Sequence, residues 1–386
     1  MKETFPEGKS DLFAGFVIRC LNLLAHDGLA GFMTPFVWMF IKSYEALRRR
    51  IIERKRIVSL IQLEYSGFEG ATVPICTYVL QNGRSEVAGS FVRLSDFVGP
   101  AVQGPTALKI IADDKATRRG ASTSGMEQHL FRVSSSSFTA IPGSPIVYWL
   151  SEKMRRTFAE GQPLGEVAKL RQGLATADNN RFLREWWEVS IPRIAFACTS
   201  REDAVQSGAH WFPYNKGGDF RKWYGNQEFV VNWENDGAEI RSFGTENGGR
   251  TRSRPQNTET YFSPSVSWSD ISSGAPSFRY FPGGFIHGNK GNSAFGPVDT
   301  LDRILSILNS QCVTSFLEAL TPTLTASVGD VAKVPLHNRM SNSPSSVINA
   351  TLIKVATNDW DGFETSWNFY SNPLVAISRC ASAERN

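Results

Sequence analysis

Polar and basic side chains that could contact a nucleic acid gather in one stretch of the chain. Residues 172–182 read Gln-Gly-Leu-Ala-Thr-Ala-Asp-Asn-Asn-Arg-Phe and lie just before two adjacent tryptophans. Asn179, Asn180 and Arg181 are of the types that read adenine and guanine through paired hydrogen bonds. Amides and glycines also build turns, so a purely structural role for this stretch stays open.

Two groups of basic residues follow and could hold the phosphates of DNA. The first group is Lys216, Arg221 and Lys222, and the second is Arg250, Arg252 and Arg254. The alternative is that these cations belong to solvated loops. The net charge of +4 permits a nucleic-acid partner without requiring one.

Other kinds of site are not supported by the sequence. The glycine-rich run at residues 282–288 is not followed by a helix, which a phosphate-binding loop needs, so a β-turn is the favoured interpretation. The five histidines have no metal-ligand spacing, and no Gly-x-Ser-x-Gly motif of a hydrolase occurs. The five cysteines lie far apart without a Cys-x-x-Cys pair, which indicates neither a zinc site nor a disulfide framework. A reducing cytoplasm is the expected setting.

The length and composition indicate a globular protein with a large core. A chain of 386 residues predicts two domains, and its 41% hydrophobic content is enough to build them. The apolar runs at residues 12–24 and 29–41 are too short to span a bilayer. We interpret both runs as core, and expect no membrane partner.

The stretch Leu29–Leu80 organises the first part of the chain. We expect a buried strand at Leu29–Thr34 and then a helix over about Phe36–Arg54, with Thr34 as its cap and Pro35 in its first position. Two further strands are predicted at Ile57–Leu63 and Val73–Leu80. A strand, a crossover helix, a strand and a tight return form half of an α/β sheet.

The flanking segments give less regular patterns. A helix is predicted from Asp11 to about Leu24, with Phe16 among the residues that face inward, and another over Tyr148–Phe158. From Leu164 to Phe295 the chain is rich in glycine and asparagine, which predicts short strands and many turns. The short strands are expected at Arg193–Cys198, Phe229–Trp233 and Phe278–Tyr280. A helix is expected over Asp299–Leu320, and weak order in the tail to Asn386.

Several segments together resemble a known family of enzymes. The first are Asp11–Phe16, Gly28–Pro35 with Trp38, and Ile57–Leu80, which resemble the region after the catalytic loop of adenine-specific DNA methyltransferases. The others are Gly173–Trp187, Trp223–Glu228, Val231–Glu234, Gly329–Val331 with Pro335, Asp359–Trp360, and Phe363–Trp367. In order and spacing, the set is similar to the C-terminal part of the large methyltransferases of BREX phage-defence systems, the PglX family, and to the related fused restriction–modification enzymes.

The resemblance implies a reaction and roles for particular residues. In this family S-adenosylmethionine donates a methyl group to N6 of an adenine that is rotated out of the duplex. Phe68 matches the aromatic residue that packs against the extruded base, and Phe16 matches a position beside the cofactor's adenine. Phe68 is equally compatible with a loop aromatic over the sheet edge, and Phe16 with a core residue.

The resemblance also implies the fold class and the domains. We expect a partial class I methyltransferase sheet of α/β type, followed by a mixed α+β, loop-rich target-recognition domain. Residues 1–100 correspond to the C-terminal half of a catalytic domain, 101–163 to a helical connector, 164–340 to the target-recognition domain and 341–386 to an extension. Double-stranded DNA is the expected partner. An N-terminal methyltransferase half or other phage-defence subunits are further possible partners.

The sequence departs from the family at the residues that carry the chemistry. It contains no Pro-Pro dipeptide, so the Asn/Asp-Pro-Pro-Tyr catalytic loop is absent, and the glycine-rich cofactor loop has no counterpart. We therefore expect a C-terminal fragment of a DNA adenine N6-methyltransferase that does not bind S-adenosylmethionine alone and is inactive alone. Two alternatives stay open, a stand-alone DNA-binding specificity subunit without catalysis and a non-functional truncated remnant.

Overall fold

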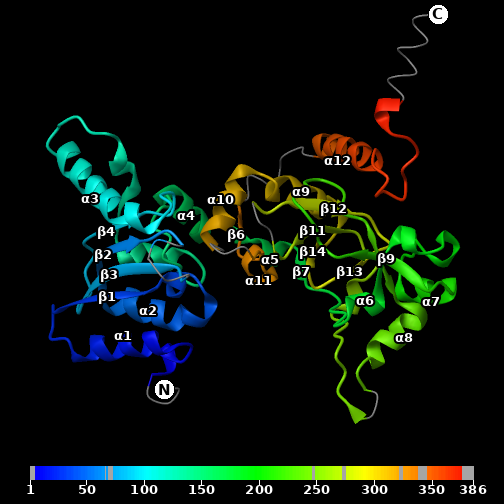
Figure 1. The fold of residues 1–386 in the computed structure, drawn as a ribbon, viewed down its shortest axis with the longest axis horizontal. Coiled ribbons are helices and arrows are strands. Elements are labelled where there is room, and N and C mark those ends of the chain that lie inside the picture. The colour runs from blue at the N-terminus through cyan, green and yellow to red at the C-terminus, as the bar shows by residue number, and fades with distance from the viewer. Residues whose placement is uncertain are drawn as a thin grey trace, which may run out of the picture. The chain divides into compact units, whose positions relative to one another are not determined.

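The computed structural model divides the chain into two compact units, unit 1 (Met1–Glu160) and unit 2 (Gly161–Asn386) (Figure 1). It describes residues 5–65, 67, 73–245, 248–271, 275–320, 325–337 and 346–375. The four-part division expected from the sequence stays a prediction. Each unit contains both helices and strands and is considered by itself.

Unit 1 is built on a five-stranded sheet with the strand order β1-β3-β2-β4-β5. Strand β3 runs antiparallel to both β1 and β2, while β2 and β4 are parallel. In Figure 1, β1 lies beside α1 at one end of this order. The strands are β1 (Leu29–Pro35), β2 (Arg56–Gln62), β3 (Ile75–Gln81), β4 (Gly89–Arg93) and β5 (Leu130–Val133). The helices are α1 (Leu12–Leu23), α2 (Glu45–Arg54), α3 (Pro100–Thr117) and α4 (Glu152–Glu160).

The three strands predicted within Leu29–Leu80 are confirmed as β1, β2 and β3. The prediction that the first of them is buried is wrong, because β1 lies at the edge of the sheet. Leu29 is 61% exposed and Met33 is 50% exposed. An apolar run of this length fits either a central or an edge strand, so its composition did not reveal its place in the sheet.

The helix predicted to begin at Phe36 begins only at Glu45. Before it the chain forms two 3₁₀ turns, Phe36–Met39 and Lys42–Tyr44. Thr34 does not cap a helix, since the strand continues to Pro35 and the Thr34 hydroxyl donates to the Pro35 carbonyl oxygen at 3.2 Å. Residues 36–44 therefore have apolar residues at helical spacing but do not form an α-helix.

The predicted helix after Asp11 is confirmed as α1, but the prediction that Phe16 faces inward is wrong. Its side chain is 61% exposed, as is that of Leu12, and Leu23 is 67% exposed. A helix turns by about 100° per residue, which places these three residues on one side. The opposite side carries Ala14, Val17, Ile18 and Leu21, all of them buried. The helix predicted at Tyr148–Phe158 begins later, at Glu152.

Unit 2 contains two four-stranded sheets, with orders β13-β9-β10-β8 and β12-β11-β14-β7, and a short β15-β6 pair. The strands of the first sheet are β8 (Leu183–Glu185), β9 (Trp211–Asn215), β10 (Phe229–Asn232) and β13 (Ile286–His287). Those of the second are β7 (Lys169–Arg171), β11 (Ser265–Ser269), β12 (Phe278–Phe281) and β14 (Gly291–Phe295). The short pair joins β6 (Gln162–Pro163) and β15 (Pro335–Leu336).

The helices of unit 2 are short except near its C-terminal end. They are α5 (Leu164–Val167), α6 (Asn179–Phe182), α7 (Arg201–Ser207), α8 (Glu234–Ser242), α9 (Val298–Leu308), α10 (Gln311–Leu320), α11 (Val328–Val331) and α12 (Ser346–Asp361). Two predicted strands are confirmed as β10 and β12. The third, at Arg193–Cys198, is wrong, because a 3₁₀ turn over Ile191–Arg193 leads there into irregular chain.

The single helix predicted over Asp299–Leu320 is interrupted at Asn309. The Asn309 side chain accepts a hydrogen bond from the Phe278 backbone N–H at 3.1 Å and donates to the Phe278 carbonyl oxygen at 2.8 Å. The Asn309 carbonyl oxygen accepts from Lys222 Nζ at 2.9 Å. These bonds tie the break between α9 and α10 to strand β12.

The expectation of weak order in the tail is wrong for the residues of α12. This helix packs against α9 (Figure 1). The side chain of Asn349, which is fully buried, donates to the carbonyl oxygen and to a carboxylate oxygen of Asp302, at 2.7 Å and 2.9 Å. A buried amide paired in this way orients the helix.

One buried arginine holds the 3₁₀ turns of unit 1 in place. The Arg48 side chain is 1% exposed, and burial lowers its pKa to about 10, so that it is protonated at pH 7. Its Nη1 donates to the carbonyl oxygens of Trp38 and Ile41 at 2.9 Å and 2.7 Å, and its Nη2 donates to that of Gly143 at 2.8 Å. Carbonyls that a continuous helix would use are thus taken by this side chain.

We predict that Arg48→Met lowers the free energy of unfolding of the chain by about 2–4 kcal/mol, because three carbonyl oxygens, that of Trp38 buried and those of Ile41 and Gly143 partly buried, lose their donor. Urea denaturation measures this loss. The matched control is Arg49→Met, since Arg49 is 59% exposed and pairs with Glu45 at 3.2 Å. That change should cost less than about 0.5 kcal/mol. Equal stabilities of the two variants would contradict the role of Arg48.

Candidate nucleic-acid interface

The amide–arginine loop, residues 172–182, is built into unit 2 between two other segments. On one side the Leu174 N–H donates to the His287 carbonyl oxygen at 2.9 Å, and the Gly173 N–H donates to that of Gly288 at 3.3 Å. A Cβ on Gly173 would lie 1.8 Å from the His287 carbonyl oxygen. Only glycine therefore allows the loop to approach β13 this closely.

On its other side the loop pairs with the arginine segment, residues 250–257. Ala175 and Arg254 exchange two backbone hydrogen bonds of 3.0 Å and 2.8 Å. The Gln256 side chain donates to the Gly173 carbonyl oxygen at 3.3 Å, and the Asn257 side chain donates to that of Gln172 at 2.8 Å. The structure thus brings together two groups of predicted site residues that lie about 70 positions apart in the sequence.

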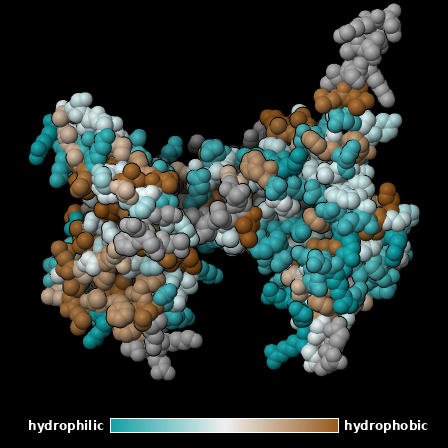
Figure 2. Space-filling view, in the orientation of Figure 1, coloured by the Kyte–Doolittle hydropathy of each residue, from teal (hydrophilic) through white to brown (hydrophobic). Residues whose placement is uncertain are grey.

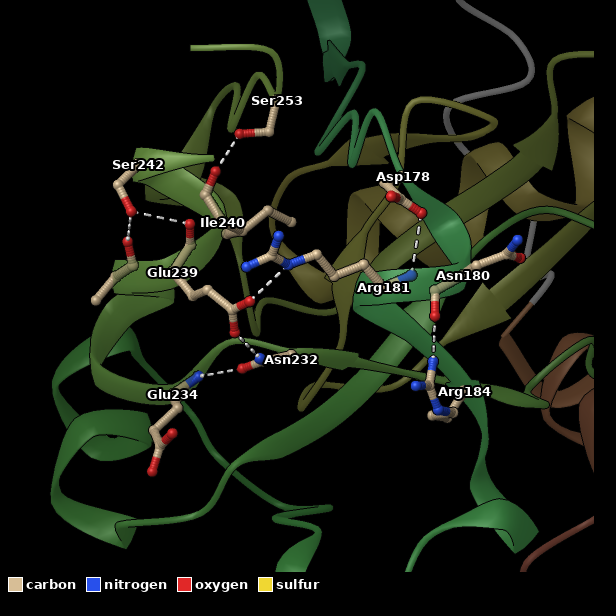
Figure 3. Close-up of polar contacts among 11 residues, drawn as sticks. Asp178, Asn180, Arg181, Arg184, Asn232, Glu234, Glu239, Ile240, Ser242 and Ser253 are labelled. Atoms are coloured by element: carbon tan, nitrogen blue, oxygen red, sulfur yellow. Dashed lines mark hydrogen bonds and ion pairs between the residues drawn. The ribbon is translucent and has the colours of Figure 1, made fainter. Parts of the chain in front are cut away.

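Arg181 lies at the centre of a polar network drawn in Figure 3. Its backbone N–H donates to the Asp178 carboxylate at 3.1 Å, which caps the short helix α6. Its Nε donates to Glu239 Oε1 at 2.8 Å, and Glu239 Oε2 accepts from the Asn232 amide at 2.7 Å. The cation of Arg181 is therefore oriented and paired.

The backbone before Glu239 sets where this carboxylate lies. Asn235, Asp236 and Gly237 all have φ values between 50° and 74°, in the left-handed region, and regular helix follows only after them. The Asp236 carboxylate accepts from Arg201 Nε at 2.8 Å and from Arg241 Nη2 at 3.2 Å. Burial raises the pKa of Asp236, but these two cations outweigh it and the pKa is lowered.

The ring of Phe243 supports two guanidinium groups. The guanidinium carbon of Arg181 lies 5.1 Å from the ring centroid, and that of Arg252 lies 5.4 Å from it. A cation over an aromatic face is stabilised by the ring quadrupole. Phe243 itself is 8% exposed, so the two flexible side chains rest on a fixed surface.

Positive charge is in excess at the arginine segment. Arg250, Arg252 and Arg254 are all exposed, and among the described residues none of them forms an ion pair with a carboxylate. Arg181, by contrast, is paired with Glu239. Phosphate groups are the ligands that such a row of unpaired arginines suits best.

The two predicted asparagines have different surroundings. The Asn179 side-chain oxygen accepts from the Thr176 hydroxyl at 2.5 Å, which is a turn-forming contact. Asn180 is exposed, and Figure 3 shows its amide pointing away from the Arg181–Glu239 pair. Its backbone carbonyl oxygen accepts from Arg184 Nη1 at 2.6 Å.

The other predicted cations of unit 2 each have a partner within the chain. Lys216 Nζ lies 4.0 Å from the centroid of the Phe229 ring, and Lys222 bonds to Asn309 as described above. Arg221 Nη1 pairs with Asp359 of α12 at 2.8 Å, and its guanidinium lies over the Trp360 ring. The structure does not place these three with the arginine segment, and their phosphate contacts stay a prediction.

Sequence reasoning missed Glu239, Asn232, Arg184 and Phe243, which orient the loop residues. Arg184 and Asn232 lie in segments that carry the family resemblance, but no motif gives any of the four a role, because their contacts come from the fold of α8 and β10 onto the amide–arginine loop. Of these four residues, Arg184 was the easiest to find from the sequence, because it follows Arg181 by three positions. Periodicity alone could not have paired it with the Asn180 carbonyl.

Of the two aromatic residues expected in the methyltransferase site, the structure describes only Phe16. Phe68 lies outside the residues that the structure describes. Phe16 is on the exposed side of α1 in unit 1. The contact of Phe16 with the adenine of S-adenosylmethionine stays a prediction.

In the part of the chain that the structure describes, no group of three or more His, Cys, Asp or Glu side chains could hold a metal ion. Nor is any helix there long and apolar enough to cross a membrane.

Comparisons with known proteins give one consistent result. The family model for the Eco57I restriction-modification methylase matches residues 1–68. The adenine-specific methyltransferase PglX of Lacticaseibacillus casei (strain Zhang) is 35% identical, covering 99% of this chain and 31% of its own length. The adenine-specific methyltransferase BrxX of Escherichia coli O9:H4 (strain HS) is 31% identical, covering 97% and 29%. The chain thus spans less than a third of the length of these relatives.

One solved structure has a similar fold along most of the chain. It is the Type IIL restriction-modification enzyme MmeI in complex with DNA, with a TM-score of 0.54. The match covers 94% of this chain and 46% of that one, at 10% identity. At this identity the likeness concerns the fold alone.

The backbone contact that holds the amide–arginine loop involves a buried histidine. Burial lowers the pKa of His287 to about 3, its Nε2 lies 2.8 Å from the Thr260 hydroxyl, and its ring packs on Tyr261 and Phe295. The unfolded chain takes up a proton near the ordinary pKa of 6.5, but the folded chain does not. Stability from this group is therefore full above pH 6.5 and is lost as the pH falls toward 3.

We predict that His287→Phe removes a pH dependence of about 1.4 kcal/mol per pH unit between pH 6 and pH 4. Urea denaturation at several pH values, compared with the unchanged chain, measures the difference. Thr260→Val is the matched control, because it loses the same hydrogen bond but keeps the histidine, and should retain the slope. An unchanged slope in His287→Phe would contradict the assignment.

Proposed function

Since the resemblance to the PglX family of adenine-specific methyltransferases extends over nearly the whole chain, we propose that this chain is part of such an enzyme and mainly recognises its DNA target. The enzyme makes N6-methyladenine in a phage-defence system of the BREX or restriction–modification type. The chain corresponds to the part that follows the catalytic loop. Unit 2 is the target-recognition domain, and double-stranded DNA is its ligand.

The single observation that carries the proposal is the pairing of the amide–arginine loop with the arginine segment. Through the Ala175–Arg254 backbone bonds, an exposed amide and a row of unpaired cations come to lie on neighbouring segments. A duplex presents phosphates and base edges close together, and a protein needs cations for the first and amides or guanidiniums for the second. This arrangement supports DNA binding better than a purely structural role.

The proposal assigns different work to the two segments. Arg250, Arg252 and Arg254 contact phosphates and position the duplex, since their cations are exposed and without carboxylate partners. Asn180 is the candidate for base contact, because its amide is exposed and points away from the internal network (Figure 3). Arg181 can contact a base only if it gives up its hydrogen bond with Glu239. Otherwise Arg181 supports the loop.

We predict that the chain shifts a DNA duplex in a gel assay, and that affinity falls steeply as the salt concentration rises. The triple variant of Arg250, Arg252 and Arg254 to glutamine should lower the slope of log affinity against log salt by about 2–3, because each phosphate contact contributes about 0.9. Arg119→Gln is the matched control, since Arg119 is exposed and belongs to unit 1. It should leave the slope unchanged.

The same assay decides between this function and its alternatives. No salt-sensitive DNA binding by the unchanged chain would contradict the proposal and favour a non-functional remnant. A slope equal in the triple variant and the control would mean that the duplex lies elsewhere on unit 2. DNA binding without methylation, even when the rest of a methyltransferase domain is supplied, would favour a stand-alone specificity subunit.

A further inference from the structure

An aromatic ring is exposed in a loop of unit 2 whose backbone is fixed on both sides of it. Phe220 is 58% exposed and belongs to residues 217–226, which we call the Phe220 loop. The carbonyl oxygens of Asp219 and Arg221 both accept hydrogen bonds from Arg279 Nη1, at 3.2 Å and 3.3 Å. The chain is therefore fastened immediately before and immediately after the exposed ring.

The residue that fastens the loop is a buried cation. Arg279 of β12 is 0% exposed, and its Nη2 donates to the Ser269 hydroxyl at 2.7 Å. Burial lowers the pKa of Arg279 to about 10, so that the side chain stays protonated at pH 7. In the part of the chain that the structure describes, its hydrogen bonds go to carbonyl and hydroxyl oxygens and not to carboxylates. The exposed Asp219 offsets part of this charge, and the remainder favours an anion at the loop surface.

The backbone of the Phe220 loop is held in an unfavourable conformation. Five of its ten residues have φ values between 57° and 136°. One of them is Trp223, with a φ of 74°, which is rare for a bulky side chain. The Trp223 N–H donates to the Phe278 carbonyl oxygen at 2.9 Å, and the Trp223 carbonyl oxygen accepts from the Tyr280 N–H at 2.8 Å, so β12 holds this residue in place. Strained backbone that the fold maintains in this way is typical of binding sites.

One turn connects the Phe220 loop with the amide–arginine loop. The Asn289 N–H donates to the Leu174 carbonyl oxygen at 3.0 Å, and the Gln172 side chain donates to the Asn289 carbonyl oxygen at 3.0 Å. The Gly288 N–H donates at 2.9 Å to the carbonyl oxygen of Asn215, which lies two residues before the Phe220 loop. Because both loops adjoin this turn, an extended ligand such as a duplex can contact both.

The surroundings of Phe220 suit a nucleic acid better than a protein. Its neighbours in the chain, residues 218–219 and 221–222, are not apolar, so the ring does not continue into a wider apolar patch along the loop. Unit 2 is mainly hydrophilic on the face shown in Figure 2. Lys216 lies over an aromatic ring and Lys222 bonds to a carbonyl oxygen, so neither charge is neutralised by these contacts. A nucleic acid combines phosphates, which such cations attract, with flat rings that stack on an aromatic side chain.

We propose that Phe220 inserts between two neighbouring base pairs of the duplex that unit 2 binds, and opens that base step. The inference rests on the proposed function, because it needs duplex DNA on unit 2. Unstacking a base step costs the duplex free energy, and stacking of the bases on the ring offsets this cost. Because Arg279 already holds the loop, the backbone around the ring loses little conformational freedom on binding. Phe220 positions the duplex in this way and takes no part in a chemical step.

The test measures the affinity of the full chain for two duplexes of one sequence, the first fully paired and the second with a single mismatch at its centre. A mismatched step is easier to open, so the unchanged chain should bind the mismatched duplex about fivefold more tightly. Phe220→Ala should weaken binding to the paired duplex about tenfold and remove the preference for the mismatch. It should leave the salt dependence of binding unchanged, because no cation is lost. Fluorescence of 2-aminopurine placed beside the mismatch should rise when the unchanged chain binds, and not when the variant binds.

Phe363→Ala is the matched control, since Phe363 is a phenylalanine of unit 2 that is 53% exposed and lies outside the Phe220 loop. It should change neither the affinity nor the preference for the mismatch. Both rings are exposed, so circular dichroism and urea denaturation should show the same folded chain in each variant. If Phe220→Ala does not fold, Phe220→Gln replaces it, because glutamine keeps a long side chain without an apolar ring, and the same losses are expected.

Two results would overturn the inference and leave the proposed function intact. The first is a Phe220→Ala chain that binds both duplexes as the unchanged chain does, which would favour a protein as the partner of the ring. The second is an equal loss of the mismatch preference in Phe220→Ala and Phe363→Ala, which would show that the effect does not depend on this loop. The proposed function itself would be contradicted if the unchanged chain bound neither duplex.

Discussion

The arrangement of unit 2 depends on one stretch of backbone, Gly173–Ala175, that is bonded on both sides. Leu174 bonds to His287 on one side and Ala175 bonds to Arg254 on the other. The stretch can enter this position only because Gly173 has no side chain to meet the His287 carbonyl oxygen. Because the backbone is fixed here, the short helix α6 begins at a defined place, and the side chains of Asn180 and Arg181 start from defined positions.

Charge at this surface is divided between paired and unpaired cations. Arg181 and Arg252 share the Phe243 ring, yet only Arg181 has a carboxylate partner, Glu239. Two like charges on one ring repel each other, and a single carboxylate offsets only one of them. The unpaired positive charge at this ring therefore comes from Arg252 of the arginine segment.

Much of the local structure could be predicted from the sequence, because it follows from patterns within a few residues. The three strands of Leu29–Leu80 and the turn-forming character of Asn179 are examples. The errors in the prediction came from contacts between residues that are distant in the sequence.

Asn309 breaks a helix by bonding to Phe278, and Arg48 takes carbonyl oxygens that the predicted helix needed. The exposed β1 shows the same limit, since an apolar strand looks alike at the centre and the edge of a sheet. For the candidate site, composition selected both basic groups, but only the fold brings Arg254 beside Ala175 and Glu239 beside Arg181.

The left-handed backbone at Asn235, Asp236 and Gly237 restricts which residue types these three positions can accept. Three consecutive residues in this region are tolerated mainly by glycine, asparagine and aspartate, because a branched side chain would clash with its own backbone. A Cβ on Gly237 would in addition lie 2.6 Å from the Trp233 ring. Sequence changes at this surface should therefore accumulate in the exposed side chains around this run, while the run itself stays restricted to glycine, asparagine and aspartate.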